Sequence, residues 1–345
     1  MNCKLTLFIP QLFRPPQPIS PIADTDQPVL PVLTRLLSRA QPSIEARADY
    51  TSTLFRQFDL TQSSAHDLPV AAVRHVAMTA HIDQGWWICI DPIHIQVDRH
   101  ALVPMAHTEL EISTQESEQL VQALREHFQD EGWQIEAMTP HHWLLKSHKK
   151  TDIHTTPLHE VMYRNMNDRL PTGTDATYWH GVLNEIQMVL HHHPVNAARA
   201  EHGQLPVNSV WLWGSGSNPE PTVVKWQKIF ADDPFVRGLA VIANVTLDTT
   251  KQFFTALDGQ DNENILLVLN DCQLAQDNHA WYATLAQLEQ QWFQPLLDNI
   301  KNHSLSELSI ISGDGRQFQL QANSLRRWWR RTKTIDYWLD KHDQD

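Results

Sequence analysis

Residues 265–311 read ILLVLNDCQLAQDNHAWYATLAQLEQQWFQPLLDNIKNHSLSELSII and carry the clearest secondary-structure pattern in the chain. The stretch opens with an apolar run at 265–269 and closes with a second one at 308–311. Between the two runs, large apolar residues recur every three or four positions: Trp281, Leu285, Leu288 and Trp292. This spacing is typical of an amphipathic helix packed on a sheet. The stretch therefore predicts a strand, a helix and a second strand.

Similar apolar runs occur earlier in the chain. We expect strands at 5–9, where Pro10 ends the run, at 86–97 and at 143–145. Pro92 lies inside the second of these runs, and because proline cannot donate a backbone hydrogen bond, it predicts a turn or a sheet edge there. Two further runs, at 210–213 and 239–245, are also typical of strands.

Helical patterns separate these runs. Apolar residues at helical spacing predict a helix over 29–40, and Ser113 with Glu116 forms a capping-box pattern at the start of another, which Gly132 should end. A third helical stripe consists of Trp179, Leu183, Ile186 and Leu190. Alternating strands and helices predict an α/β layered fold with a largely parallel sheet flanked by helices.

The chain of 345 residues is long enough for two domains. The polar segment 147–156, rich in Lys and His, is the best candidate for a boundary. We therefore expect an N-terminal α/β region at 1–150 and a C-terminal one at 151–345, with a single intertwined domain as the alternative.

Composition excludes several classes of protein. A 41% hydrophobic content excludes a disordered chain, and three widely spaced cysteines exclude a disulfide scaffold. No apolar run reaches the ~18 residues of a membrane helix, and Pro10 interrupts the N-terminal run before it could act as a signal peptide. We expect a cytoplasmic protein without membrane contact. The net charge of −13 disfavours general binding to nucleic acid.

The densest motif is HPVNAARAEHGQLPVNSVWLWGSGSNP, residues 193–219. It places an arginine and amide side chains before a glycine-containing turn that follows an apolar strand, which is one way to clamp an anion. We expect a small phosphorylated or carboxylated ligand here, with a purely structural turn as the alternative. The candidate residues are His193, Asn196, Arg199, Asn208, Gly214, Ser215 and Gly216.

Two groups of residues are typical of metal ligands. Consecutive helical residues point about 100° apart, so His191, His192 and His193 cannot share one ion, and a solvated helix end explains them better. Asp271, His279 and Asp314 follow apolar runs and are candidate metal ligands, with caps and turns as the alternative.

The segment RRWWRRTK, residues 326–333, is strongly basic. Arginines interleaved with indoles can bind phosphates and stack on bases, or can contact an acidic partner protein. The alternative is a contact with the acidic body of the same chain. The candidate partner-binding residues are Arg326, Arg327, Trp328, Trp329, Arg330 and Arg331.

Several of these stretches together resemble one family. LNEIQMVLHHHPVNAARAEHG, LPVNSVWLWGSGSNP and WWICIDPIHIQVDRHALVP are similar to bacterial proteins labelled cofactor-independent phosphoglycerate mutase-like. More distantly, the segment 193–216 resembles the H-P-x-N-x-x-R…G…P-x-N…G-x-G segment of archaeal cofactor-independent phosphoglycerate mutases, in the alkaline phosphatase superfamily. The resemblance implies an alkaline-phosphatase-like fold and, in active members, two metal ions and a Ser or Thr nucleophile.

The chain departs from that pattern where the chemistry would lie. The first strand should end in a metal-binding Asp-Gly, but Pro10 and Gln11 stand there. Thr34 is displaced from the expected nucleophile position, and Gly315 follows Asp314 where a His ligand belongs. Asp271 and His279 match the remaining Asp…His pair.

We therefore expect a degenerate phosphoglycerate mutase-like protein, without cofactor or metal, that binds a ligand or a partner protein in a regulatory role. The first alternative is an active phosphomutase or phosphatase that uses Mn²⁺ or Zn²⁺. The second is a nucleic-acid-associated accessory protein that acts through the C-terminal basic segment.

Overall fold

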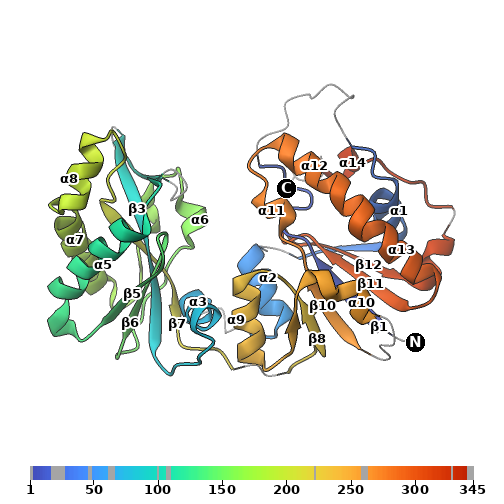
Figure 1. Ribbon diagram of the computed structural model, residues 1–345, viewed down its shortest axis with the longest axis horizontal. Coiled ribbons are helices and arrows are strands. Elements are labelled where there is room, and N and C mark those ends of the chain that lie inside the picture. The colour runs from blue at the N-terminus through green and yellow to red at the C-terminus, as the bar shows by residue number, and fades with distance from the viewer. Residues whose placement is uncertain are drawn as a thin grey trace. The chain divides into compact units, whose positions relative to one another are not determined.

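The computed structural model describes residues 3–16, 28–45, 49–60, 67–98, 101–105, 110–220, 223–257, 263–327 and 329–339. The chain divides into two compact units, shown in Figure 1. Unit 1 combines Met1–Asp59 with Pro221–Asp345, and unit 2 is the intervening segment Leu60–Glu220. Unit 2 is thus an insertion into unit 1.

These boundaries differ from the expected division at residue 150, which falls inside unit 2. The polar residues that suggested a boundary make contacts within unit 2 instead. Thr155 donates hydrogen bonds to Asp67 from both its backbone N–H and its hydroxyl, and the carbonyl of Thr156 accepts one from the indole of Trp211. A polar segment can therefore be fixed inside a folded unit by its hydrogen bonds rather than link two units.

The sheet of unit 1 has the order β2-β12-β11-β1-β10-β8-β9. The five strands β11, β1, β10, β8 and β9 are parallel, while β12 and β2 add antiparallel strands at one edge. Their bounds are β1 Cys3–Phe8, β2 Gln41–Ile44, β8 Lys228–Phe230, β9 Leu247–Asp248, β10 Asn264–Val268, β11 Leu305–Ile311 and β12 Arg316–Gln321. The expected largely parallel sheet is confirmed for this unit.

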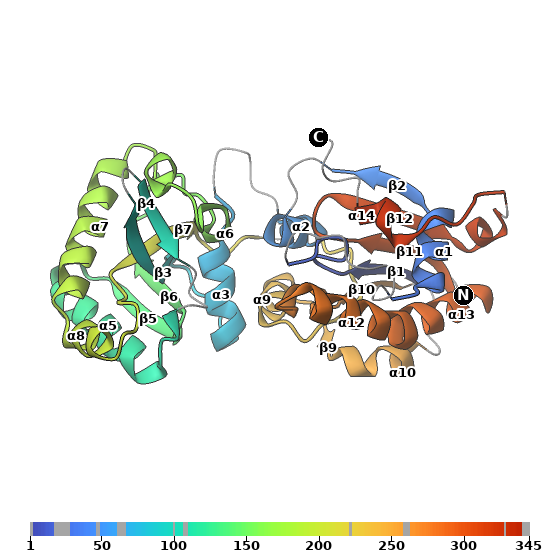
Figure 2. The ribbon, with the colours of Figure 1, turned by 90° about the horizontal axis from the view of Figure 1, so that it is seen from above.

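Helices cover both faces of this sheet (Figures 1 and 2). One face of β1 and β10 packs in a core with α1, α10, α12, α13 and α14. On the other face, Phe8 stacks on Tyr50 of α2, which also contacts Phe235 of α9. The bounds are α1 Pro31–Arg39, α2 Tyr50–Gln57, α9 Pro234–Ala243, α10 Phe253–Leu257, α11 Asp271–Leu274, α12 Asn278–Leu288, α13 Gln294–Lys301 and α14 Ile335–Leu339.

The stretch 265–311 forms the predicted strand, helix and strand, as β10, α12 and β11. Trp281, Leu285 and Leu288 are buried on one side of α12, whereas Trp292 lies in the π-helical turn Glu289–Phe293 that leads into α13. The expectation of a strand at 239–245 is wrong, because most of that run belongs to α9. Asp233 caps this helix and Pro234 occupies its first position, so a local start signal outweighs the apolar run.

Unit 2 is built on an antiparallel sheet. The long strand β3 Trp86–Asp98 pairs with β4, β6 and β7, and β5 extends the sheet beyond β6. Pro92 lies within β3 opposite Val210 of β7 rather than at a turn. The remaining bounds are β4 Ala101–Met105, β5 Gln134–Thr139, β6 His142–Ser147 and β7 Ser209–Gly216. A largely parallel sheet is therefore a property of unit 1 alone.

The helices of unit 2 lie on both faces of its sheet. Helices α5, α7 and α8 share a core with β3, β6 and β7, and α3 packs against the opposite face of β3 and β7. Their bounds are α3 Val70–Thr79, α5 Thr114–His127, α6 Leu158–Val161, α7 Ala176–His191 and α8 Pro194–Glu201. The capping box of Ser113 and Glu116 is confirmed at the start of α5. Gly132 ends the short 3₁₀ turn that follows α5, not the helix itself.

In the described parts of the chain, no helix is both long and apolar enough to cross a membrane.

Candidate functional site

The carboxyl edge of the parallel sheet in unit 1 is where a two-metal site of the implied kind would lie. Pro10 and Gln11 follow β1, and backbone contacts hold this turn. Gln11 donates its N–H to the carbonyl of Ser312, at 3.1 Å, and its own carbonyl accepts the indole N–H of Trp281, at 3.0 Å. The turn after β1 thus supplies no carboxylate to an ion.

Asp314 lies in the turn between β11 and β12, and it is already paired. Its carboxylate accepts two hydrogen bonds from the guanidinium of Arg316 and one from the hydroxyl of Ser312. Both side chains of the ion pair are at least nine-tenths buried. Burial by itself would raise the pKa of Asp314, but the hydrogen bonds and charge of Arg316 outweigh it and lower the pKa. The guanidinium of Arg316 thus already neutralises the charge of this carboxylate.

The other two candidate ligands do not join Asp314. Asp271 is exposed at the start of α11, and His279 is exposed near the start of α12. All three residues are described, yet their ligand atoms do not come together within 4.8 Å. Among the described residues, these three candidate ligands therefore do not converge on one ion.

Asp271 instead lines a pocket of about 480 Å³ beside the ends of β8 and β10. Asp233, in the same pocket, caps α9 and accepts hydrogen bonds from the hydroxyl of Tyr50 and the amide of Asn270. Burial, together with the charge of Asp233, raises the pKa of Tyr50. Both oxygens of the Asp233 carboxylate therefore accept hydrogen bonds from the protein itself.

Thr34 cannot act as a nucleophile in this conformation. It is buried within α1, and its hydroxyl donates to the carbonyl of Leu30 at 2.6 Å. The first turn of α1 is capped by the buried carboxylate of Glu289, which accepts from the N–H groups of Val32, at 2.5 Å, and Leu33, at 2.9 Å. A protein carboxylate therefore occupies this helix N-terminus.

In unit 2, most side chains of the expected anion-binding motif form hydrogen bonds within the protein. Arg199 is only 1% exposed, and it donates to the carbonyls of Leu205 and Leu110 and to the carboxylate of Glu116. Asn196 bonds the backbone of Leu190 and Val207. These contacts account for both side chains without a ligand.

The rest of the motif also has structural contacts. The amide of Asn208 pairs with both backbone groups of Ile95, and Ser215 is buried in β7. Gly214 has φ +63°, and a Cβ added there would lie 2.8 Å from the Cβ of Val70. At Gly216 an added Cβ would lie 2.6 Å from Pro69. Both glycines thus allow the start of α3 to pack closely on β7.

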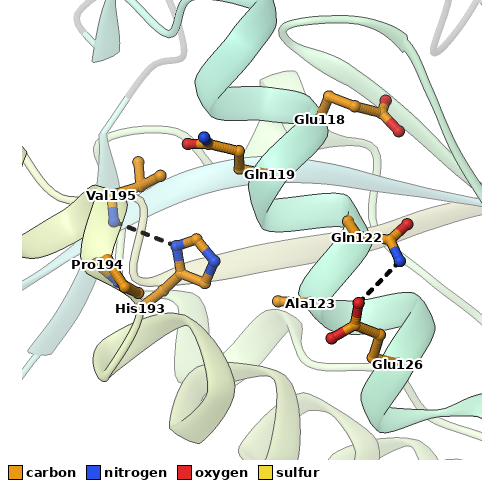
Figure 3. A pocket seen from close by; sticks show the side chains of 8 residues that line it. All are labelled: Glu118, Gln119, Gln122, Ala123, Glu126, His193, Pro194 and Val195. Atoms are coloured by element: carbon orange, nitrogen blue, oxygen red, sulfur yellow. Dashed lines mark hydrogen bonds between the residues drawn. The ribbon is translucent and has the colours of Figure 1, made fainter.

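His193 lines a pocket together with Pro194 and Val195 of the same motif (Figure 3). Its Nδ1 accepts the N–H of Val195 and caps α8, at 3.2 Å, and burial lowers its pKa. The ring faces α5 across a cavity of about 570 Å³ whose other polar walls are Glu118, Gln119, Gln122 and Glu126. His191 and His192 are exposed at the end of α7, as expected for a solvated helix end.

The C-terminal basic segment lies against α1. Arg327 donates to the carbonyl of Arg39 at 3.3 Å, and Arg330 donates to the carbonyl of Ala40 at 2.6 Å. Arg326, Trp329 and Arg331 are exposed, and Trp328 lies outside the described residues. Two of the expected partner-binding arginines therefore cap a helix of the same chain.

Sequence reasoning missed a buried cluster in unit 2. Asp91 of β3 is fully buried and accepts hydrogen bonds from Arg74 of α3, at 2.8 Å, and from the indole of Trp213, at 2.8 Å. The guanidinium also lies 4.7 Å from the centre of the Trp213 ring. The one signal in the sequence was a carboxylate inside an otherwise apolar strand, because such a group needs a buried partner.

Part of the chain is similar in sequence to a family of enzymes. Residues 94–196 match the family model for 2,3-bisphosphoglycerate-independent phosphoglycerate mutase. The 2,3-bisphosphoglycerate-independent phosphoglycerate mutase of Methanothrix thermoacetophila is 35% identical over 96 residues, which cover 28% of this chain and 23% of that protein. A probable enzyme of the same name from Geobacter sulfurreducens is 28% identical over 131 residues, 38% of this chain and 33% of its own length.

Among solved structures, the PH0037 protein of Pyrococcus horikoshii resembles this chain with a TM-score of 0.57 at 11% identity, covering 92% of this chain and 87% of that one. This likeness concerns the fold alone. The chain is thus similar to the cofactor-independent phosphoglycerate mutases. The matches to the two relatives span a third or less of those proteins, and the family-model match, residues 94–196, lies within unit 2.

Proposed function

We propose that this chain is a phosphoglycerate mutase-like protein that does not carry out metal-dependent phosphoryl transfer and that works by binding a partner. The observation that carries the proposal is the buried ion pair of Asp314 with Arg316, at the sheet edge where a metal ligand is expected. The turn at Pro10 and Gln11, which lacks a carboxylate, supports it.

The chemistry of two-metal catalysis explains why these features matter. Divalent ions bind where several carboxylates or imidazoles converge, and they supply the charge that activates the nucleophile and stabilises the transferred phosphoryl group. Arg316 neutralises the carboxylate of Asp314. The ligand atoms of Asp271, His279 and Asp314 do not come together within 4.8 Å. The hydroxyl of Thr34 is hydrogen-bonded inside a helix. A chain with this edge keeps the fold but has few of the groups that the reaction needs.

The test is a turnover assay on the purified full chain with 3-phosphoglycerate, and separately with a generic phosphomonoester, in the presence of Mn²⁺ or Zn²⁺. We expect no rate above that of a protein-free blank with either metal. The alternative, an active phosphomutase or phosphatase, predicts turnover that a chelator abolishes and that Asp314→Ala removes. Observation of that pattern would overturn the proposal.

A further inference from the structure

A group of cations gathers at the C-terminal end of α1. The segment 327–333 runs along this end of the helix, because Arg327 and Arg330 donate to the carbonyls of Arg39 and Ala40 and the N–H of Lys333 donates to the hydroxyl of Ser38, at 3.0 Å. These contacts fix the segment and bring its other side chains to the same end of the helix.

Most of this positive charge has no counter-charge. Arg35, Arg326, Arg331 and Lys333 are exposed, and within the described residues none of them forms an ion pair. We call these four residues, together with Arg39 and Trp329, the basic surface. Such a surface is unusual on a chain whose net charge is −13.

Arg39 has side-chain donors that find no acceptor among the described residues. Its Nε and Nη1 atoms are buried and have no hydrogen-bond acceptor in the described part of the chain. An unsatisfied buried donor destabilises the fold, and more so when the group is charged. Within the described residues, Arg39 therefore adds a positive charge that no carboxylate pairs.

The strand β2 begins directly after this end of α1. All four of its residues, Gln41 to Ile44, are exposed, and Ile44 is 73% exposed. It is the last strand of the described sheet on the side of β12, as Figure 2 shows. A sheet edge of this kind offers backbone hydrogen bonds to an added extended chain.

We propose that the basic surface and the edge of β2 together bind an extended acidic segment of a partner protein. The segment would add alongside β2, place carboxylates on the exposed Arg326 and Arg331, and contact the indole of Trp329, which is 65% exposed. This inference names the partner in the proposed binding role and rests on that role.

Charge and geometry favour an acidic protein segment over a nucleic acid. A long polyanion would meet repulsion from the rest of a chain with net charge −13, whereas a short segment meets only the basic surface. The backbone groups of a strand edge pair with a peptide backbone, which a nucleic acid does not have.

The test measures binding of a fluorescein-labelled oligoglutamate peptide to the full chain by fluorescence anisotropy at low salt. The variant Arg326→Ala/Arg331→Ala removes two exposed cations that make no hydrogen bond within the described chain, so the fold should be retained. The control Lys4→Ala/Arg237→Ala removes two exposed cations elsewhere in unit 1. We expect the first variant to weaken binding about tenfold or more and the control to change it less than about twofold.

Three results would overturn the inference: no binding by the wild-type chain, equal weakening by both variants, or tighter binding of single-stranded oligo-dT that the first variant alone abolishes. The last result would assign the basic surface to nucleic acid. Metal-dependent turnover would overturn the proposed function without altering this binding experiment, so the two failures are distinguishable.

Discussion

Asp314 is the candidate metal ligand whose contacts the structure defines most fully. Its carboxylate is buried against Arg316, whose side chain also donates to the carbonyl of Trp338 in α14. An aspartate in this setting stabilises the turn between two strands and links it to a neighbouring helix. The same residue type at a strand end is thus a structural anchor here.

We predict that Asp314→Asn destabilises the chain by about 3 kcal/mol at neutral pH, because it leaves a buried arginine without its charge partner. The folded pKa of Asp314 is lowered, so its stabilisation is complete above the unfolded pKa of about 3.9 and is lost as the pH falls through the folded pKa. The difference between wild type and variant in urea unfolding should therefore shrink at acidic pH. Asp298→Asn, at an exposed pair with Lys301, is the control and should have no measurable effect.

Arg199 of unit 2 also belongs to a buried ion pair, with Glu116. We predict that Arg199→Ala costs about 3 kcal/mol, near the lower end for a broken buried pair because Glu116 retains some contact with solvent. Arg169→Ala, at an exposed position, should change stability by less than about 0.5 kcal/mol. Unchanged unfolding of Arg199→Ala, together with loss of binding to inorganic phosphate, would instead assign Arg199 to an anion site.

At the scale of elements, the close packing of α3 on β7 explains why glycines follow the apolar strand. We predict that Gly214→Ala destabilises unit 2 by about 3 kcal/mol, from a strained positive φ and from overlap with Val70. Gly203→Ala is the matched control, because Gly203 also has a positive φ but no atom lies within 4 Å of an added Cβ. Gly203→Ala should lower the free energy of unfolding by only about 1 kcal/mol, which is the cost of a positive φ in a residue with a Cβ. Equal effects in thermal unfolding would contradict the packing role.

Local patterns predicted the elements well because their causes are local. The stripe of Trp281, Leu285 and Leu288 and the capping box at Ser113 each act within a few residues, and both are confirmed. The candidate site was harder to predict, because its decisive contacts join distant residues. Glu289 caps a helix more than 250 positions earlier in the chain, and Glu116 pairs with Arg199, 83 positions away. Nothing near either glutamate indicates its partner.

At the scale of the whole molecule, the chain inserts an antiparallel unit into a largely parallel one. A polar segment in the sequence predicts a boundary only between two continuous domains, so the expected division near residue 150 did not include a unit made of two separate segments. The family match over residues 94–196 lies wholly within the inserted unit, whereas the metal ligands implied by the resemblance belong to the surrounding one. The family match and the candidate metal ligands therefore lie in different units of the chain.

The proposed function requires that unit 1 does not hold a pair of divalent ions. Plasma mass spectrometry of the full chain, after incubation with Mn²⁺ and Zn²⁺ and extensive dialysis, measures this most directly. We expect far less than one retained ion per chain, with the same value for wild type and Asp314→Asn. Two retained ions per wild-type chain, lost in the variant, would contradict it.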